Sequence, residues 1–168
     1  WLKDAEIIDE KSKLTPFGEL CVEINRENTT LLWELIHINL AYNSPLMGWF
    51  SSSVGFNTEI GRKDFDKLAL EYFQQTFKET TITYAVQALV QTFKYSPIGE
   101  DLRQFVSQDT KGTSFQRLPY NDLSPEAVAY SLYKYAEQKG IKMLRVSDLY
   151  RSEELCGVYR EFGISKGE

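Results

Sequence analysis

Residues 31–42 read LLWELIHINLAY and are apolar on nearly every side of a helix. Polar residues 25–29 precede this stretch, and Asn43-Ser44-Pro45 follows it. The pattern therefore predicts one helix confined between these breaks. Because a helix that is apolar all round belongs in the interior of a domain, we expect this segment to be the central buried helix of the fold.

The chain contains a single histidine, His37, and it lies on this helix. Histidines on buried helices are mostly hydrogen-bonded core residues, and no second histidine or Cys-x-x-Cys spacing supplies further metal ligands. A catalytic serine or cysteine would need His37 as its base, and no Gly-x-Ser-x-Gly turn positions one. No glycine-rich phosphate loop follows a strand. We therefore expect no catalytic residue, no metal and no cofactor.

Apolar residues that recur every three or four positions predict further helices on both sides of the central one. The expected ranges are 16–24, 45–50, 64–77, 82–93, 97–106 and 125–139. The last range has the clearest ends, because Ser124-Pro125 is a helix start and Gly140 is a left-handed cap. The ranges 64–77 and 82–93 fit either a helix-turn-helix or a plain helical hairpin.

Short strands are expected at 115–118, as an edge strand, and at 141–146, where apolar and polar residues alternate. Residues 147–162 are expected to be a last helical region. Residues 1–8 have helical spacing with no cap before them, as in a chain cut from something longer. Together these patterns predict a mainly α, compact helical domain with a few short strands.

Length and composition fit a globular domain in the cytoplasm. The chain has 168 residues, of which 42% are hydrophobic, enough for a sizeable core. No segment approaches the roughly 18 consecutive apolar residues of a membrane span, and no secretion signal is recognised. Cys21 and Cys156 are expected to be reduced, partly buried thiols, with Cys21 on the apolar side of the helix at 16–24.

Charge is unevenly distributed along the chain, although the net charge is only -5. Residues 1–34 hold four basic and eight acidic side chains, whereas residues 134–151 hold five basic and two acidic ones. A local excess of positive charge is either a solvated face or a nucleic-acid contact. The candidate nucleic-acid-binding residues are Lys139, Lys142, Arg145 and Arg151.

Aromatic residues are the second kind of candidate. Tyr133 is expected to be exposed on the helix at 125–139, where it could stack on a base or simply belong to the core. Trp49 and Tyr159 are expected to be exposed aromatics that, with Tyr133, dock a partner. The residues leave open whether such a partner is another protein or a second copy of the chain.

Five segments together resemble a known family. They are 1–8, LTPFG at 14–18, the tryptophan-containing helix at 31–42, the segment 96–102 with Glu100-Asp101, and AYSLY at 129–133. They resemble the uncharacterised domain of bacterial DNA phosphorothioation loci, which occurs alone or fused C-terminally to a phosphoadenosine phosphosulfate reductase-like protein. The resemblance covers nearly the whole chain, but it rests on packing and turn motifs.

The resemblance implies that residues 1–24 are the end of an upstream winged-helix-like unit and that residues 25–168 form a helical domain. The reductase-like enzyme has a Ser-Gly-Gly-x-Asp-Ser loop that this sequence lacks, so its activity is not transferred to any residue here. The expected function is a noncatalytic DNA- or partner-binding accessory module. The alternatives are a docking or dimerisation domain for the reductase-like enzyme, and a part of a sulfonucleotide reductase or transferase that contributes to its active site. The expected partners are duplex DNA, the reductase-like domain and modification or restriction proteins, and no membrane.

Overall fold

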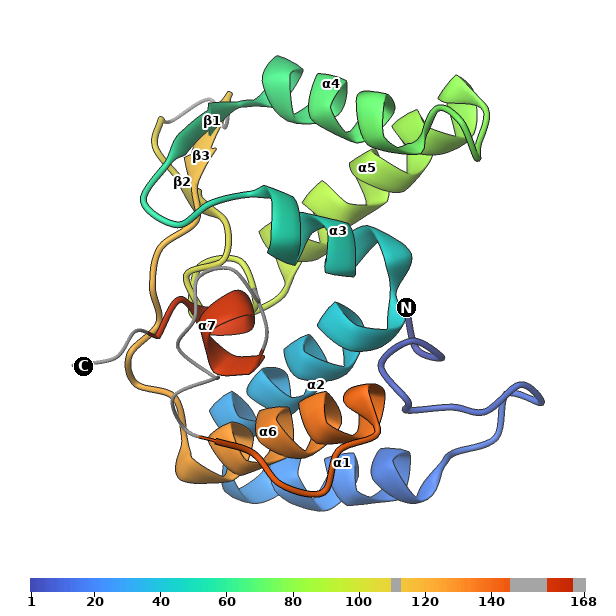
Figure 1. Cartoon of the computed structure of the whole chain (residues 1–168), viewed down its shortest axis with the longest axis vertical. Coiled ribbons are helices and arrows are strands. Elements are labelled where there is room, and N and C mark those ends of the chain that lie inside the picture. Colours follow the sequence, from blue (N-terminus) through green and yellow to red (C-terminus); the bar gives the residue numbers. More distant parts are fainter. Residues whose placement is uncertain (110–112, 146–156, 165–168) are drawn as a thin grey trace. The chain divides into compact units, whose positions relative to one another are not determined.

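The computed structural model describes residues 1–109, 113–145 and 157–164. Within these ranges it contains seven helices and one three-stranded antiparallel sheet, so the prediction of a mainly α fold with a few short strands is confirmed. The chain divides into two compact units (Figure 1). Unit 1 comprises Trp1–Ser53 and Tyr120–Glu168, and unit 2 comprises Val54–Pro119. None of the described helices is both long and apolar enough to cross a membrane.

Unit 1 is built around α2, Thr29–Asn43, which contacts α1 (Pro16–Glu27), α3 (Pro45–Ser53), α6 (Pro125–Lys139) and α7 (Gly157–Phe162) (Figure 1). Nine of the 15 residues of α2 are buried. The prediction of a central buried helix is therefore confirmed, and its side chains are the main apolar surface on which the other helices of unit 1 pack.

The first residues of unit 1 form turns instead of the helix that their spacing suggests. The carboxylate of Asp9 accepts hydrogen bonds from the backbone amides of Lys11 and Lys13, at 2.8 and 2.9 Å. The chain reverses there, and Ile8 forms an isolated antiparallel bridge with Leu14. Local side-chain to backbone bonds of this kind compete with helix formation. These residues lie within unit 1, and their expected link to an upstream unit stays a prediction.

Unit 2 contains a pair of packed helices and the sheet. The helices are α4 (Arg62–Phe73) and α5 (Glu79–Tyr95), and α5 turns back beside α4 (Figure 1). The sheet has the order β1-β3-β2, with β1 at Glu59–Gly61, β2 at Val106–Ser107 and β3 at Ser114–Gln116. The expected strand at 115–118 is therefore present but central, because β1 and β2 pair with its two edges.

Two expected elements are absent. Residues 97–105 form turns, not a helix: Ile98 and Leu102 are fully buried, and a Cβ at Gly99 would lie 2.1 Å from the carbonyl oxygen of Phe93. The segment folds back tightly onto the end of α5, which no local pattern reveals. Residues 141–145, the described part of the other expected strand, contain no strand.

Candidate nucleic-acid interface

Helix α6 has well-defined ends that determine where the chain leaves it. Its first residue is Pro125, and the Ser124 hydroxyl accepts a hydrogen bond from the backbone amide of Ala127 at 3.4 Å. At the other end Gly140 has φ 65°, and its amide donates to the carbonyl of Glu137 at 3.1 Å, while the amide of Ile141 donates to that of Ala136 at 3.0 Å. A left-handed glycine in this arrangement ends a helix and reverses the chain. Both predicted ends of α6 are thus confirmed.

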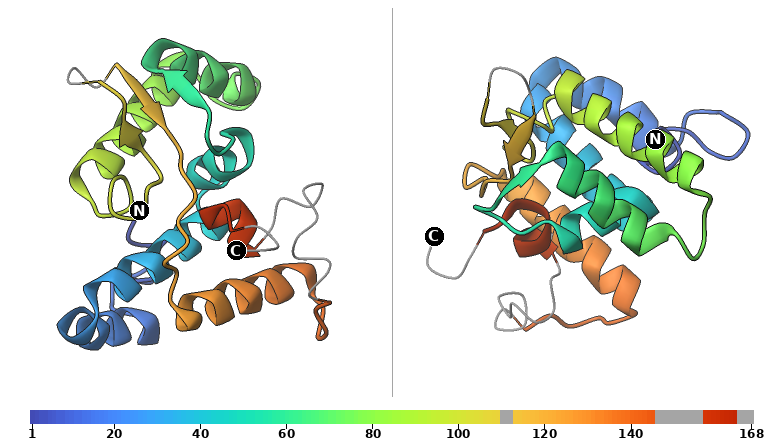
Figure 2. Two further views of the ribbon diagram at one scale, coloured as in Figure 1. Left: turned by 90° about the vertical axis from the view of Figure 1, so that its left-hand side faces the viewer. Right: turned by 90° about the horizontal axis from the view of Figure 1, so that it is seen from above.

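The chain turns back sharply after α6, as Figure 1 and the right-hand view of Figure 2 show. Leu144 in the returning segment packs on the buried ring of Tyr135, together with Tyr42 and Leu132. Because Leu144 faces inward, its neighbours face outward: Lys142, Met143 and Arg145 are all exposed. We call residues 139–145 the basic tip.

The basic tip carries three positive charges, from Lys139, Lys142 and Arg145, and no acidic residue. All three side chains are exposed, and none of them takes part in the ion pairs of the described ranges. Lys139 places its ammonium 5.9 Å from the centre of the Tyr135 ring. Cations that are neither buried nor neutralised by a neighbour attract a polyanion at little desolvation cost.

A fourth basic residue of the same helix behaves differently. Lys134 is 7% exposed, and its ammonium lies 2.7 Å from a carboxylate oxygen of Glu6 and 3.7 Å from one of Glu137. Its charge is therefore neutralised by ion pairs within unit 1. The structure thus brings three of the four predicted cations together, whereas Arg151 lies outside the described residues.

The three predicted aromatic contacts are placed differently from one another. Tyr133 is 60% exposed, as expected, and its hydroxyl donates to Glu137 at 3.3 Å. Trp49 is only 3% exposed, so the expectation of a surface aromatic is wrong there: the short helix α3 packs against α2 and α7 and buries it. Tyr159 on α7 is half-buried. Of the three, Tyr133 alone has a largely open ring.

His37 is fully buried, which confirms that it is a core residue. Its Nε2 donates to the backbone carbonyl of Glu161 at 3.1 Å, and its ring meets that of Phe162 edge-on, with centroids 5.2 Å apart. The carboxylate of Glu161 accepts a hydrogen bond from Ser131 at 2.6 Å. Burial, followed by the proximity of Glu161, raises the pKa of Tyr42 far above its usual value. These groups form a buried polar network between α2, α6 and α7.

A second buried carboxylate, Glu34, lies near the start of α6. It is 1% exposed and accepts hydrogen bonds from the hydroxyl and the backbone amide of Ser124. Burial raises its pKa above the ordinary value, and the hydrogen bonds from Ser124 only partly offset this. Its contacts explain its position: it holds the first turn of α6 against α2.

Potential chemistry elsewhere is sparse in the part of the chain that the structure describes. No group of three or more His, Cys, Asp and Glu side chains converges there. Cys21 is buried on α1, and burial raises its pKa, so the thiol is less nucleophilic than a free one.

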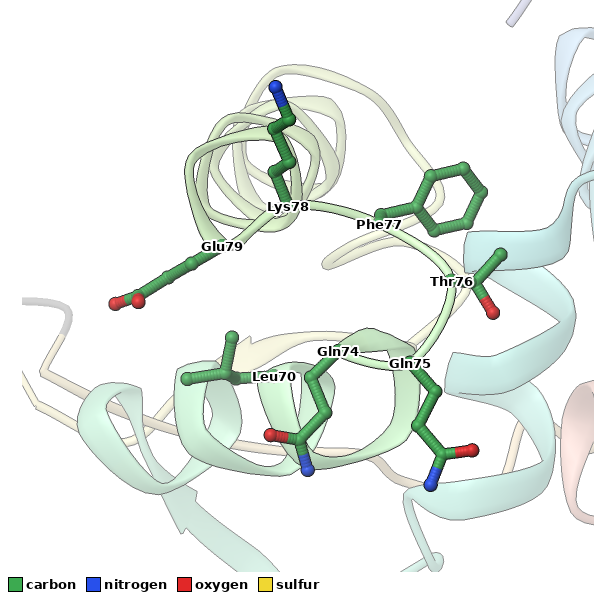
Figure 3. A pocket seen from close by; sticks show the side chains of 7 residues that line it. All are labelled: Leu70, Gln74, Gln75, Thr76, Phe77, Lys78 and Glu79. Atoms are coloured by element: carbon green, nitrogen blue, oxygen red, sulfur yellow. The ribbon is translucent and has the colours of Figure 1, made fainter.

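Unit 2 has an open hollow of about 440 Å³ at the turn between α4 and α5 (Figure 3). Its lining is one stretch of chain, Gln74–Glu79, together with Leu70. In Figure 3 the side chains of Phe77 and Lys78 point away from the space between the two helices. The side chains of Gln74 and Gln75 also point away from that space (Figure 3), so these polar groups do not converge in the hollow.

Sequence reasoning missed one residue of the basic tip, Met143, which is 89% exposed. In the sequence, Met143 belongs to the apolar and polar alternation of the expected strand, and its outward position depends on the contact between Leu144 and Tyr135. The available signal was an apolar residue inside a basic run.

Comparison of the chain with protein-family models, with curated proteins and with solved structures finds no match.

Proposed function

We propose that this chain is a noncatalytic DNA-binding module that contacts the phosphate backbone of duplex DNA through the basic tip. The observation that supports it is the exposure of Lys139, Lys142 and Arg145 within seven residues, none of them in an ion pair with a described residue. Arg151 follows the tip in the sequence and belongs to the same proposal. Phosphate contacts by such cations supply most sequence-independent affinity. The resemblance to the phosphorothioation-linked domain suggests a setting, namely an accessory module for DNA sulfur modification or its associated restriction.

The acidic net charge of the chain does not oppose this proposal. Eight of the 24 acidic residues lie in residues 1–34, and two that lie against α6 or on it, Glu6 and Glu137, pair with Lys134. Electrostatic interactions with the remaining acidic residues fall off over a Debye length of about 8 to 10 Å at ordinary salt. A short, locally basic tip therefore acts on a phosphate that touches it, whatever the distant charge. The result is a weak, salt-sensitive contact that depends on few residues.

The test is duplex binding as a function of salt concentration, with the variant K139A/K142A/R145A. Its matched control is K11A/K13A/K63A, which removes the same charge from exposed lysines elsewhere. Because each phosphate contact contributes about 0.9 to the slope of log K against log salt, we expect the tip variant to lower the slope by about 2.7 and the affinity more than tenfold at low salt. Equal loss in both variants, or no duplex binding by the wild type, would refute the proposal.

A second candidate function is docking to a reductase-like partner. The observation that favours it is a set of exposed aromatic residues on the helical pair of unit 2, with Tyr72, Phe77 and Tyr84 exposed by 62, 48 and 73%. Exposed aromatic rings are common anchors at protein interfaces. Co-purification with the reductase-like enzyme that is lost in Y72A/Y84A, together with absent duplex binding, would select this function.

A further inference from the structure

We propose that Met143 inserts between adjacent base pairs from the minor groove and kinks the duplex, while Lys142 and Arg145 hold the flanking phosphates. This inference rests on the proposed DNA-binding function and gives it a mode of contact. It starts from the exposure of Met143: at 89% it exceeds that of every other exposed large hydrophobic residue described, the next being Tyr95 at 75% and Tyr84 at 73%.

The backbone on both sides of Met143 is braced. On one side, the left-handed Gly140 and the hydrogen bond from Ile141 to Ala136 fix the turn to the end of α6. On the other side, Leu144 packs on Tyr135. A side chain on a braced turn is held outward without a cost in ordering the chain at the moment of binding, which favours affinity.

The chemistry of methionine suits this role. Its side chain is long, unbranched and polarisable, and methionine is one of the apolar residues that proteins use as wedges between base steps. Its neighbours Lys142 and Arg145 are exposed and carry the charges that phosphates on either side would bind. The Cα atoms of Lys142 and Arg145 are three residues apart, hence within about 11 Å, and both side chains are long. With two long side chains, a separation up to that limit is enough for contact with phosphates on both sides of a minor groove about 6 Å wide.

The same combination of basic and apolar side chains is also found at anionic membrane surfaces, but the tip fits a duplex better. Interfacial membrane binding uses a helix with a continuous apolar face. The tip is a turn of seven residues with two exposed apolar side chains, Met143 and Ile141, the latter 41% exposed. That apolar area is small for a lipid surface and sufficient for one base step.

The experiment uses the full chain and a duplex of about 25 base pairs with a central TA step, which is easily kinked. One adenine of that step is replaced by 2-aminopurine, whose fluorescence rises on unstacking, and the duplex ends carry a donor and an acceptor dye. We expect the wild type to raise both the 2-aminopurine signal and the energy transfer between the ends. Met143→Ala should abolish both changes, whereas Met143→Leu should retain them.

Binding measured in parallel separates the two proposals. Met143→Ala should lower affinity only a few-fold and leave the salt slope unchanged, and Tyr95→Ala, which removes an exposed ring from unit 2, should change nothing. Two results would refute the insertion of Met143 while leaving the DNA-binding proposal intact. One is that Met143→Ala binds and bends the duplex like the wild type, and the other is that the wild type binds without unstacking the bases. If K139A/K142A/R145A binds the duplex like the wild type, both the DNA-binding proposal and the insertion of Met143 are refuted. Binding to phosphatidylserine vesicles that requires Met143, without duplex binding, would also overturn both.

Discussion

The basic tip and the buried polar network lie in the same unit and contain comparable numbers of polar groups, yet they differ in what surrounds those groups. In the network, the side chains of Ser131 and Glu161 are fully buried and hydrogen-bonded to each other. In the tip, Lys142 and Arg145 are exposed and form no ion pair with described residues. A buried polar group stabilises a fold only through its partners, whereas an exposed cation remains available to a ligand. Mutations should therefore separate the two regions: network variants lower stability, and tip variants lower binding.

The largest effect is expected in the network. Glu161→Ala leaves the hydroxyl of Ser131 buried without its carboxylate, and each unsatisfied buried group costs about 1 to 3 kcal/mol. We expect the free energy of unfolding to fall by about 2 to 4 kcal/mol in denaturant titrations. The control is Glu137→Ala, an exposed glutamate of α6, which should change stability by less than about 0.5 kcal/mol. Equal effects of the two variants would erase the distinction between the regions.

A matched pair of arginines sharpens the comparison. Arg160 is half-buried and donates to the carbonyls of Gly48 at 2.9 Å and Ala41 at 3.3 Å, whereas Arg145 is exposed. Arg160→Ala should lower the free energy of unfolding by about 1 to 3 kcal/mol and leave the duplex affinity of the folded protein unchanged. Arg145→Ala should lower duplex affinity roughly threefold to tenfold without destabilising. Denaturation should thus show a loss of stability only in Arg160→Ala, and fluorescence anisotropy should show a loss of duplex affinity only in Arg145→Ala.

The pH dependence of stability tests the buried carboxylate Glu34. Burial raises the pKa of Glu34 in the folded state above the ordinary value of 4.5. At a pH between the unfolded-state pKa and this raised folded-state pKa, the folded protein holds a proton that the unfolded chain has lost. Stability from this group is then present below pH 4.5 and is lost as pH rises through the folded pKa. The unfolding free energy of the wild type relative to Glu34→Gln should rise as pH is lowered from 7 towards 4.5. A difference that falls over this range would show that the hydrogen bonds from Ser124 outweigh burial.

The smallest effect on stability is expected for Tyr133, the exposed ring on α6. Tyr133→Ala removes only a long hydrogen bond to Glu137 and should change stability by less than about 0.5 kcal/mol. If the ring stacks on an unpaired base, affinity for single-stranded DNA should fall by about 1 to 3 kcal/mol, and duplex affinity should not. Tyr95→Ala is the control, because Tyr95 is also exposed but lies in unit 2. An effect on duplex affinity alone would place Tyr133 in the same interface as Lys139.

The parts of the structure that the sequence predicts well are those with local signals. Helix α6 has both ends predicted because Ser124-Pro125 and Gly140 act on their own backbone, and α2 is recognised because its apolar residues surround it. Residues 97–105 depend on packing against the end of α5, which is a tertiary contact. Strand β1 has three residues, too few for an alternation to be recognised.

The candidate site divides in the same way. The charges of Lys139, Lys142 and Arg145 are visible in the sequence, but their exposure is not. For Lys142 and Arg145 it follows from the packing of Leu144 on Tyr135, which leaves the residues on both sides of Leu144 exposed. For Trp49 the sequence predicts an exposed ring, and the structure buries it. The helix that carries it, α3, is short and largely apolar, so no periodic pattern distinguishes its buried side from its exposed side.

The glycine that ends α6 has a wider consequence. Gly140 joins the last turn of that helix, which carries Lys139, to the segment that carries Lys142 and Arg145, and a Cβ placed there would meet no atom within 4 Å. Only its positive torsion angle excludes larger residues. A single replacement would therefore change the direction of Lys142 and Arg145 relative to Lys139 while leaving all three charges in place, which gives evolution, or a protein engineer, a means of changing orientation independently of charge.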